Sequence, residues 1–567
     1  MKRLLVAIGL LAGGAVSARA QTAPPAPPAP LPLKHAPEPT APAVTAADLM
    51  SRLYVFADDS MMGREAGTPG HIKGTEYIER ELRRLSLEPA GDRGSFFQDF
   101  TLETIAPQVK VSVGNEALTP GTDFLAFPFV GLPALGAPFD ATGVNVVFGG
   151  KLGTPNLVAP DAVNGKLVLF LPPDGPTGWQ FWSRFGPPQY QRYAGSKGLI
   201  VAALDVTPEP VRDLIQGKEQ MRIAGQSEMQ KGEIPLLYVT KAAAEKMMGG
   251  PLSGILPGAE GKPVTAQGWF GAVPVAAPAR NVVAIVRGSD PKLKEQYVAF
   301  GAHTDHDGIR DPVDHDSLRA FNAIVRPGGA EDGAKQATPA QLESVRALLD
   351  SLRGGNPARV DSIMNGADDD ASGSMALLEL AELFAKNPAK RSLLFVWHTA
   401  EEKGLFGSRW FTDNPTVPRD SIVAGLNIDM IGRGGANDLK NGGPGYLQLI
   451  GSRRLSTQLG DLVEEVNTKG NHGFGFDYQY DADNHPQQYY CRSDHYNYAR
   501  YGIPVVFFST GGHRDYHMPT DEPQYIDYDK LARVTMFIGE VGKAVANLDQ
   551  RLVVDQPKPD PAGECKQ

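Results

Sequence analysis

Apolar and polar positions change their spacing along the chain, and this change indicates where an α/β region begins. From about residue 280, short apolar runs alternate with longer amphipathic stretches. The apolar runs that we expect to form strands are 281–286, 297–301, 392–397, 426–430 and 503–508. The stretches that we expect to form helices are 372–386 and the one that follows Gly404. Apolar runs of this length between amphipathic helices are typical of an α/β sheet that is buried on both faces.

The region before residue 280 divides into two parts. Residues 46–86 carry helical patterning around a Gly and Pro turn. Residues 116–274 contain short β-rich runs separated by Gly and Pro, which predicts a separate small domain. Within it, segments 165–170 and 194–201 resemble a protease-associated domain, a β-rich insert often found in exported peptidases. The alternative is that these runs are strands of the main sheet.

Both ends of the chain are predicted to lie outside the folded domains. Residues 1–20 are typical of a secretory signal peptide, because basic residues precede an apolar stretch and small residues surround Ala20. A membrane anchor is the alternative, but the apolar stretch is shorter than the roughly 20 residues that span a bilayer. Residues 21–45 are rich in Pro and Ala and predict an extended linker, and 551–567 form a polar tail. We therefore expect export to the periplasm or the medium.

Composition and cysteine content indicate which partners the protein can bind and whether a disulfide can stabilise it. The 42% hydrophobic and 21% charged residues are typical of a soluble globular protein. A net charge of -10, from 55 basic and 65 acidic residues, supplies no basic surface for nucleic acid or an anionic membrane. Export would permit a disulfide between Cys491 and Cys565, the two cysteines of the chain. Because Cys565 lies in the polar tail, we expect no structural disulfide.

Acidic residues and histidines follow the predicted strands at the points where the strands end. His303 and Asp305 follow the run at 297, Glu401 and Glu402 follow the run at 392, and Asp429 lies in the run at 426. Chemistry in such sheets collects at the carboxyl ends of the strands. Two further pieces are the Asp-rich segment 366–373, at the start of a helix, and segment 515–521, after the last strand. So much negative charge at the rim of a buried sheet is unfavourable unless cations compensate it.

Zinc fits these side chains, because imidazole and carboxylate ligands without cysteine are typical of zinc sites. Two ions about 3.5 to 4 Å apart would need one carboxylate to bridge them. The adjacent Glu401 and Glu402 are then expected to have different roles. One glutamate binds metal, and the other, which binds no metal, takes a proton from the attacking water.

Five motifs in this order resemble the di-zinc aminopeptidases of metallopeptidase family 28. They are Gly-Ala-His303-Thr-Asp305-His, Gly-Ala-Asp-Asp369-Asp-Ala-Ser-Gly, Glu401-Glu402-Lys-Gly-Leu-Phe-Gly-Ser, Asn-Ile-Asp429-Met and Tyr516-His517-Met-Pro-Thr-Asp521. The resemblance covers about residues 46–110 and 275–545. It implies a mixed, mostly parallel central sheet flanked by helices, in a discontinuous catalytic domain of residues 46–115 and 275–550.

The resemblance also implies two zinc ions per chain and a role for each motif residue. His303 and Asp429 would bind one zinc, Glu402 and His517 the other, and Asp369 would bridge the two. Glu401 would be the general base. Asp305 would orient the His303 ring, and Tyr516 would stabilise the oxyanion.

The implied activity is that of an exported aminopeptidase acting on the N-terminal residue of a peptide. A carboxypeptidase could use the same metal set, and a non-catalytic binding protein on the same scaffold is a further alternative. Ser493-Asp494-His495 resembles a triad fragment, but no nucleophile elbow precedes it. Six other histidines, among them His306 and His513, are expected at the surface or behind the ligands. Residues 310–365 form an insertion that most relatives replace by a short loop. We expect it to cover the cleft, and the alternative is a surface excursion without a role.

Overall fold

The computed structural model describes residues 31–127, 139–175, 192–208, 212, 221–225, 236–332, 336–439 and 441–567. The predicted signal peptide, residues 1–20, lies outside this part of the chain. Among the described residues, no helix combines the length and the apolar character needed to cross a bilayer.

The larger of the two regions is built on a sheet whose centre is parallel. The strand order is β1-β12-β16-β13-β17-β20-β18-β19, and β2 also pairs with β12. The strands are β1 (Glu88–Pro89), β2 (Phe97–Phe100), β12 (Ala279–Val286), β13 (Tyr297–His303), β16 (Ser392–His398), β17 (Ile422–Ile428), β18 (Tyr446–Ile450), β19 (Gly475–Asp477) and β20 (Val505–Ser509). The neighbours β16, β13, β17 and β20 run parallel, whereas β12 and β18 flank them in the antiparallel direction. This central sheet is the mixed α/β sheet that the sequence predicts.

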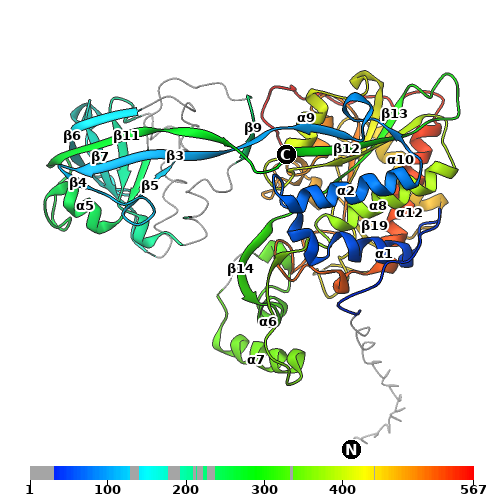
Figure 1. Cartoon of the computed structure of the whole chain (residues 1–567), viewed down its shortest axis with the longest axis horizontal. Coiled ribbons are helices and arrows are strands. Elements are labelled where there is room, and N and C mark those ends of the chain that lie inside the picture. Colours follow the sequence, from blue (N-terminus) through cyan, green and yellow to red (C-terminus); the bar gives the residue numbers. More distant parts are fainter. Residues whose placement is uncertain are drawn as a thin grey trace, which may run out of the picture.

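Helices cover both faces of the central sheet (Figure 1). They are α1 (Ala46–Phe56), α2 (Pro69–Arg84), α8 (Ala371–Lys386), α9 (Phe406–Asp413), α10 (Thr457–Lys469), α11 (His495–Ala499) and α12 (Tyr528–Asn547). Short 3-10 helices complete the region: η1 (Asp59–Arg64), η2 (Asp92–Gly94), η7 (Arg419–Ser421), η8 (Gln479–Asp481), η9 (Tyr489–Cys491) and η10 (Pro523–Tyr525). Alternate residues of β13 point to opposite faces: Phe300 packs in the core with α8 and α12, and Ala299 in the core with α9 and α11. Burial on both faces explains why these strands are continuous apolar runs.

A second sheet lies beside the first and is joined to it by two long strands. Its order is β4-β3-β11-β6-β7-β8-β10-β5, with β9 on β3. The elements are β3 (Leu102–Val113), β4 (Glu116–Ala117), β5 (Phe124–Phe127), β6 (Phe139–Lys151), η3 (Pro160–Val163), β7 (Leu167–Leu171), β8 (Gly198–Val201), η5 (Leu204–Val206), β9 (Met221–Ile223), β10 (Leu236–Val239), α5 (Lys241–Met248) and β11 (Glu260–Pro274). Figure 1 shows β3 and β11 running together from this sheet toward the first. The second sheet begins at Leu102, before the predicted boundary at residue 115, and its protease-associated character stays a prediction.

The insertion between β13 and α8 folds as a small unit of its own (Figure 1). It consists of β14 (Gly308–Asp314), α6 (His315–Val325), η6 (Gly329–Asp332), α7 (Pro339–Arg353) and β15 (Val360–Met364). Strands β14 and β15 pair antiparallel and close the unit at its base. Thr338 and Gln341 form a capping box at the start of α7.

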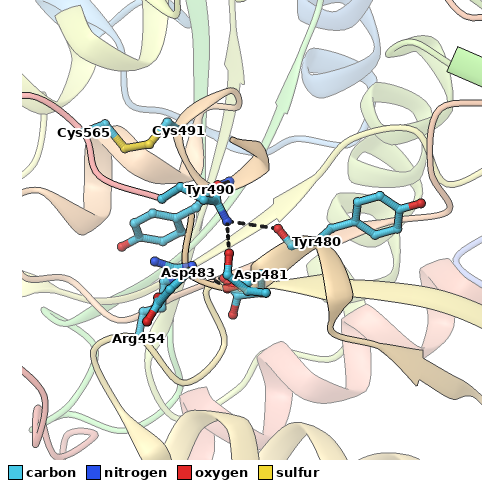
Figure 2. Close-up of a disulfide and its surroundings, with 9 residues drawn as sticks. Arg454, Tyr480, Asp481, Asp483, Tyr490, Cys491 and Cys565 are labelled. Atoms are coloured by element: carbon cyan, nitrogen blue, oxygen red, sulfur yellow. Dashed lines mark hydrogen bonds and ion pairs between the residues drawn. A yellow bond between two sulfur atoms is a disulfide. The ribbon is translucent and has the colours of Figure 1, made fainter. Parts of the chain in front are cut away.

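The prediction that the protein has no structural disulfide is wrong. Cys491 and Cys565 are bonded, with an S–S distance of 2.02 Å (Figure 2). The polar tail is held in place by hydrogen bonds that its composition does not indicate. The Gln567 side chain accepts from the Tyr490 amide at 2.9 Å and donates to the Tyr480 carbonyl at 3.1 Å. These contacts keep Cys565 beside Cys491, so the tail closes back onto the loop before α11.

Candidate metal centre

Three neighbouring strands deliver the predicted site residues to one edge of the central sheet. His303 is the last residue of β13, and Asp429 directly follows β17. Glu401 and Glu402 follow β16 after a turn in which Ala400 has a positive φ of 56°. Because β13 lies between β16 and β17 and is parallel to both, their carboxyl ends meet.

Asp369 comes from the other side, in the turn that begins α8. Its backbone amide donates to Asp521 Oδ2 at 3.1 Å, and the Asp368 amide donates to the same carboxylate at 3.0 Å. Asp521 is fully buried. Its carboxylate therefore fixes the turn that presents Asp369 to the centre of the site.

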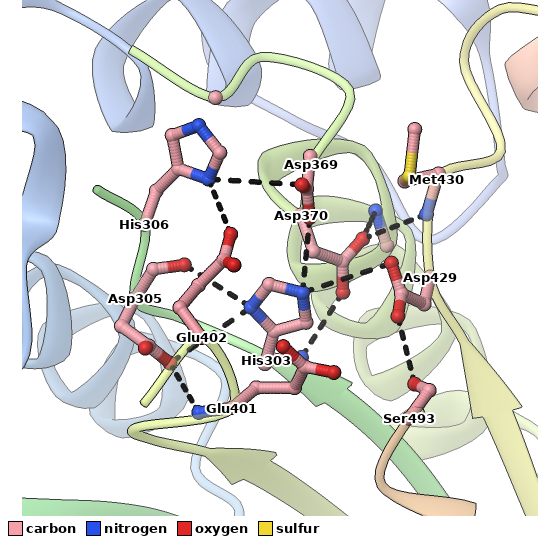
Figure 3. A network of polar contacts seen from close by, with 12 residues as sticks. His303, Asp305, His306, Asp369, Asp370, Glu401, Glu402, Asp429, Met430 and Ser493 are labelled. Atoms are coloured by element: carbon pink, nitrogen blue, oxygen red, sulfur yellow. Dashed lines mark hydrogen bonds and ion pairs between the residues drawn. The ribbon is translucent and has the colours of Figure 1, made fainter. Parts of the chain in front are cut away.

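The two oxygens of Asp369 face two separate groups of ligands. Oδ1 lies 3.1 Å from His303 Nε2, which in turn is 3.6 Å from Asp429 Oδ1. Oδ2 lies 3.1 Å from His517 Nε2, which is also 3.1 Å from Glu402 Oε2. Figure 3 shows Asp369, His303 and Asp429 converging on one side and Glu402 beside Asp369 on the other. A carboxylate in this position can bridge two metal ions.

The chemistry of these donors fits metal ions better than it fits hydrogen bonding. Asp369 Oδ2 and His517 Nε2 are both buried, and neither makes a hydrogen bond to a described residue. Burial raises the pKa of the Glu401 carboxyl well above its usual value, because the charged form loses its hydration. Bound cations would offset this cost and supply the missing partners.

Asp370 and His306 also lie within ligand distance of this cluster. The Asp370 carboxylate, however, already accepts from three backbone amides, those of His303, Gly373 and Met430, at 3.0, 2.9 and 3.2 Å. It therefore acts as the N-cap of α8 and ties α8 to β13 and β17. The sequence reasoning assigned His306 no specific contact, but its Nδ1 lies 2.7 Å from Glu402 Oε1, so it orients that carboxylate. The position of His306, three residues after His303, was the sequence feature that could have indicated a place beside the ligands.

Asp305 orients His303 through a different atom from the one expected. His303 Nδ1 lies 3.1 Å from the main-chain carbonyl of Asp305 and 3.8 Å from its carboxylate. The carboxylate accepts instead from the Glu401 amide at 3.1 Å. Asp305 thus links the loop after β13 to the loop after β16, as Figure 3 shows.

Ser493 and Tyr516 complete the surroundings of the site. Ser493 Oγ donates to Asp429 Oδ2 at 2.7 Å, so this serine supports a candidate ligand and is not part of a Ser-Asp-His triad. The Tyr516 ring lies 4.0 Å from the His517 ring between centroids. The Tyr516 hydroxyl accepts from Arg492 Nη2 at 3.3 Å.

These residues surround an open cleft. Residues from the strand ends, the loop before α11, the segment after β20 and the insertion line it: His303, Ala330, Glu331, Asp369, Glu401, Glu402, Asp429, Met430, Gln487, Tyr489, Arg492, Ser493, Phe507, Ser509, Gly512 and Tyr516. Each predicted ligand except His517 contributes to this lining.

Comparison with known proteins gives one family and several partial relatives. Residues 281–541 match the model of Peptidase family M28. A probable leucine aminopeptidase of Arthroderma benhamiae is 33% identical over 128 residues, which are 22% of this chain and 32% of that protein. An aminopeptidase of Pseudomonas aeruginosa is 39% identical over 95 residues, which are 15% of this chain and 18% of that protein. The chain thus spans about a third or less of the length of these curated relatives.

Among solved structures, the chain is similar to BSAP, a zinc aminopeptidase from Bacillus subtilis. The identity is 15% and the TM-score 0.47, over 92% of this chain and 100% of that one.

Proposed function

Residues 281–541 belong to peptidase family M28, and from this premise we propose that the protein is a zinc-dependent aminopeptidase. The observation that carries the proposal is the position of Asp369, with one carboxylate oxygen toward His303 and the other toward His517. The aminopeptidase names of the partial relatives support the same activity. The substrate would be a peptide with a free N-terminus, and the signal-like residues 1–20 favour export to the periplasm or the medium.

We assign the ligands of two zinc ions from this geometry. His303 and Asp429 would hold one ion, Glu402 and His517 the other, and Asp369 would bridge them. Zinc, when bound there, would supply a Lewis acid for the scissile carbonyl and for the attacking water.

Residues of the chain would then transfer the proton of the attacking water and stabilise the negative charge of the oxyanion. Glu401 lines the cleft but lies outside both ligand groups, so its carboxylate is free to take a proton from water and to return it to the leaving amine. The Asp305 carboxylate fixes the Glu401 backbone. Arg492 donates to the Tyr516 oxygen, which leaves the Tyr516 hydroxyl hydrogen to stabilise the oxyanion.

A carboxypeptidase is the second candidate, and Arg492 is the observation in its favour. Its guanidinium lines the cleft and could bind a free carboxylate.

The test uses amino-acid p-nitroanilides, their N-acetylated counterparts and N-blocked dipeptides with a free carboxyl end. We expect zinc-loaded wild-type protein to cleave only the free-amine substrates. Glu401→Gln should lower kcat by about 10² to 10⁴ with the zinc content unchanged, because it removes the general base. Glu343→Gln, in an exposed position on α7, serves as the matched control.

Cleavage of the N-blocked dipeptides alone would replace the proposal by the carboxypeptidase. A zinc-loaded wild-type protein that cleaves neither series would refute both activities.

A further inference from the structure

The insertion forms one wall of the cleft. Ala330 and Glu331, both in η6, line the cleft together with Glu401 and Arg492. The Ala330 amide donates to the carbonyl of Gly512 at 2.9 Å, and Gly512 lines the same cleft. A segment far from the motifs in sequence therefore contacts the space where a substrate would lie.

This wall is fixed to the segment that carries Tyr516 and His517. A Cβ on Gly329 would lie 2.3 Å from the Gly512 carbonyl oxygen, so the two backbones are in close contact. Helix α6 adds side-chain contacts to the same segment: His315 Nε2 lies 2.9 Å from Glu522 Oε2, and Arg319 lies 3.3 Å from the Asp515 carboxylate. The position of Glu331 is thus set by the fold.

Glu331 is the one acidic residue of the cleft lining that neither the metal ligands nor the general base account for. Its carboxylate accepts from the Tyr489 hydroxyl at 2.6 Å and forms no ion pair with a described residue. Arg492, the cation of the lining, donates to Tyr516 and interacts with Glu331 only through space. Glu331 is exposed and therefore presents a negative charge at the mouth of the cleft.

The same cleft also has apolar lining. Met430 and Phe507 line it and are mostly buried, with exposed fractions of 7% and 4%. Buried apolar side chains and an exposed carboxylate in one cleft match a substrate side chain with a long aliphatic stem and a terminal positive charge. Lysine and arginine have this shape.

We infer that Glu331 is a specificity-determining residue that favours substrates with an N-terminal lysine or arginine. This inference rests on the proposed aminopeptidase activity and adds the class of substrate. The ammonium or guanidinium group would approach the Glu331 carboxylate, which Tyr489 holds in place, while the stem lies on Met430 and Phe507.

The test compares lysine p-nitroanilide with norleucine p-nitroanilide, which has the same carbon stem without the ammonium group. In Glu331→Gln, we expect the ratio of kcat/KM for lysine to that for norleucine to fall about threefold to tenfold, because a partly exposed ion pair is lost. The norleucine value should stay within about twofold of wild type, and Glu343→Gln should change neither value. Glu331→Asp keeps the charge and should retain most of the ratio.

Each other outcome has a separate meaning. An unchanged ratio in Glu331→Gln would overturn the inference and leave the aminopeptidase intact. An equal loss for both substrates would also overturn it, because Glu331 would then act only by positioning Tyr489. If zinc-loaded wild-type protein cleaves neither substrate, the proposed function fails and the inference fails with it.

Discussion

Arg64 connects the N-terminal region to two of the segments that carry candidate metal ligands, those of His303 and Asp369, and its removal should weaken zinc binding from a distance. The side chain is 1% exposed and lies at the end of η1. Its guanidinium donates to the carbonyls of Thr304, Phe56, Asn365 and Gly366 at 3.0, 2.9, 2.7 and 3.1 Å. Thr304 directly follows His303, and Gly366 begins the turn that contains Asp369.

The expected magnitude follows from the number of carbonyls that lose a donor. In Arg64→Lys, a single nitrogen replaces the planar fork and cannot reach all of these carbonyls, so about two of them stay unpaired. A buried unsatisfied group costs about 1 to 3 kcal/mol, which predicts a loss of roughly 2 to 6 kcal/mol in the free energy of unfolding. Because the segments that carry His303 and Asp369 both lose this support, zinc affinity should fall by about 10 to 100-fold.

Two measurements check this prediction. Urea unfolding gives the free energy of unfolding, and competition with a chromophoric chelator gives the zinc affinity. Arg83→Lys is the control, because the Arg83 side chain is 64% exposed and contacts only the Glu79 carboxylate and the Phe96 ring through its guanidinium among the described residues. The reasoning is refuted if Arg64→Lys has the same zinc affinity as this control and unfolds within about 1 kcal/mol of it.

Two further predictions concern the disulfide and acid stability. Replacing Cys491 and Cys565 by Ala opens a loop with a sequence separation of 74, so chain entropy should lower the free energy of unfolding by about 4 kcal/mol. The same change should raise KM, because Arg492 of the cleft directly follows Cys491. Unchanged thermal unfolding would contradict this prediction. Burial, with Arg280 and Arg64 nearby, lowers the pKa of His71 to about 3. Since the unfolded chain binds a proton below pH ~6.5 that the folded one does not, His71 should cost about 2 kcal/mol of stability at pH 5, a loss that grows as the pH falls. In His71→Gln, the free energy of unfolding from urea titrations should therefore fall less between pH 7 and pH 5 than in wild type, by about 2 kcal/mol. The same fall in both proteins would show that His71 is not the group responsible.

The elements of the central sheet could be predicted because their signals are local. Strands such as β13 and β16 are short apolar runs that burial on both faces requires, and α8 has an Asp-rich start that caps it. The pattern also indicates that acidic residues and histidines, such as Asp429 after β17, follow the strand ends. The ligand set itself was implied by the resemblance of five motifs to metallopeptidase family 28.

Contacts between segments far apart in sequence could not be predicted. The bond between Cys491 and Cys565 depends on Gln567, whose hydrogen bonds to Tyr490 and Tyr480 no composition indicates. The atom through which Asp305 contacts His303 could not be predicted either, because the backbone carbonyl of Asp305, and not its carboxylate, lies next to His303 Nδ1.

The sequence by itself determined the type of sheet and the residue types that collect at its edge, because apolar periodicity and strand ends are properties of short segments. Tertiary structure alone decided that the two oxygens of Asp369 face His303 and His517, and that Glu331 of the insertion lies in the same cleft. The physical reason is that these relations depend on how strands and loops pack in three dimensions, where many pairings are compatible with one apolar pattern.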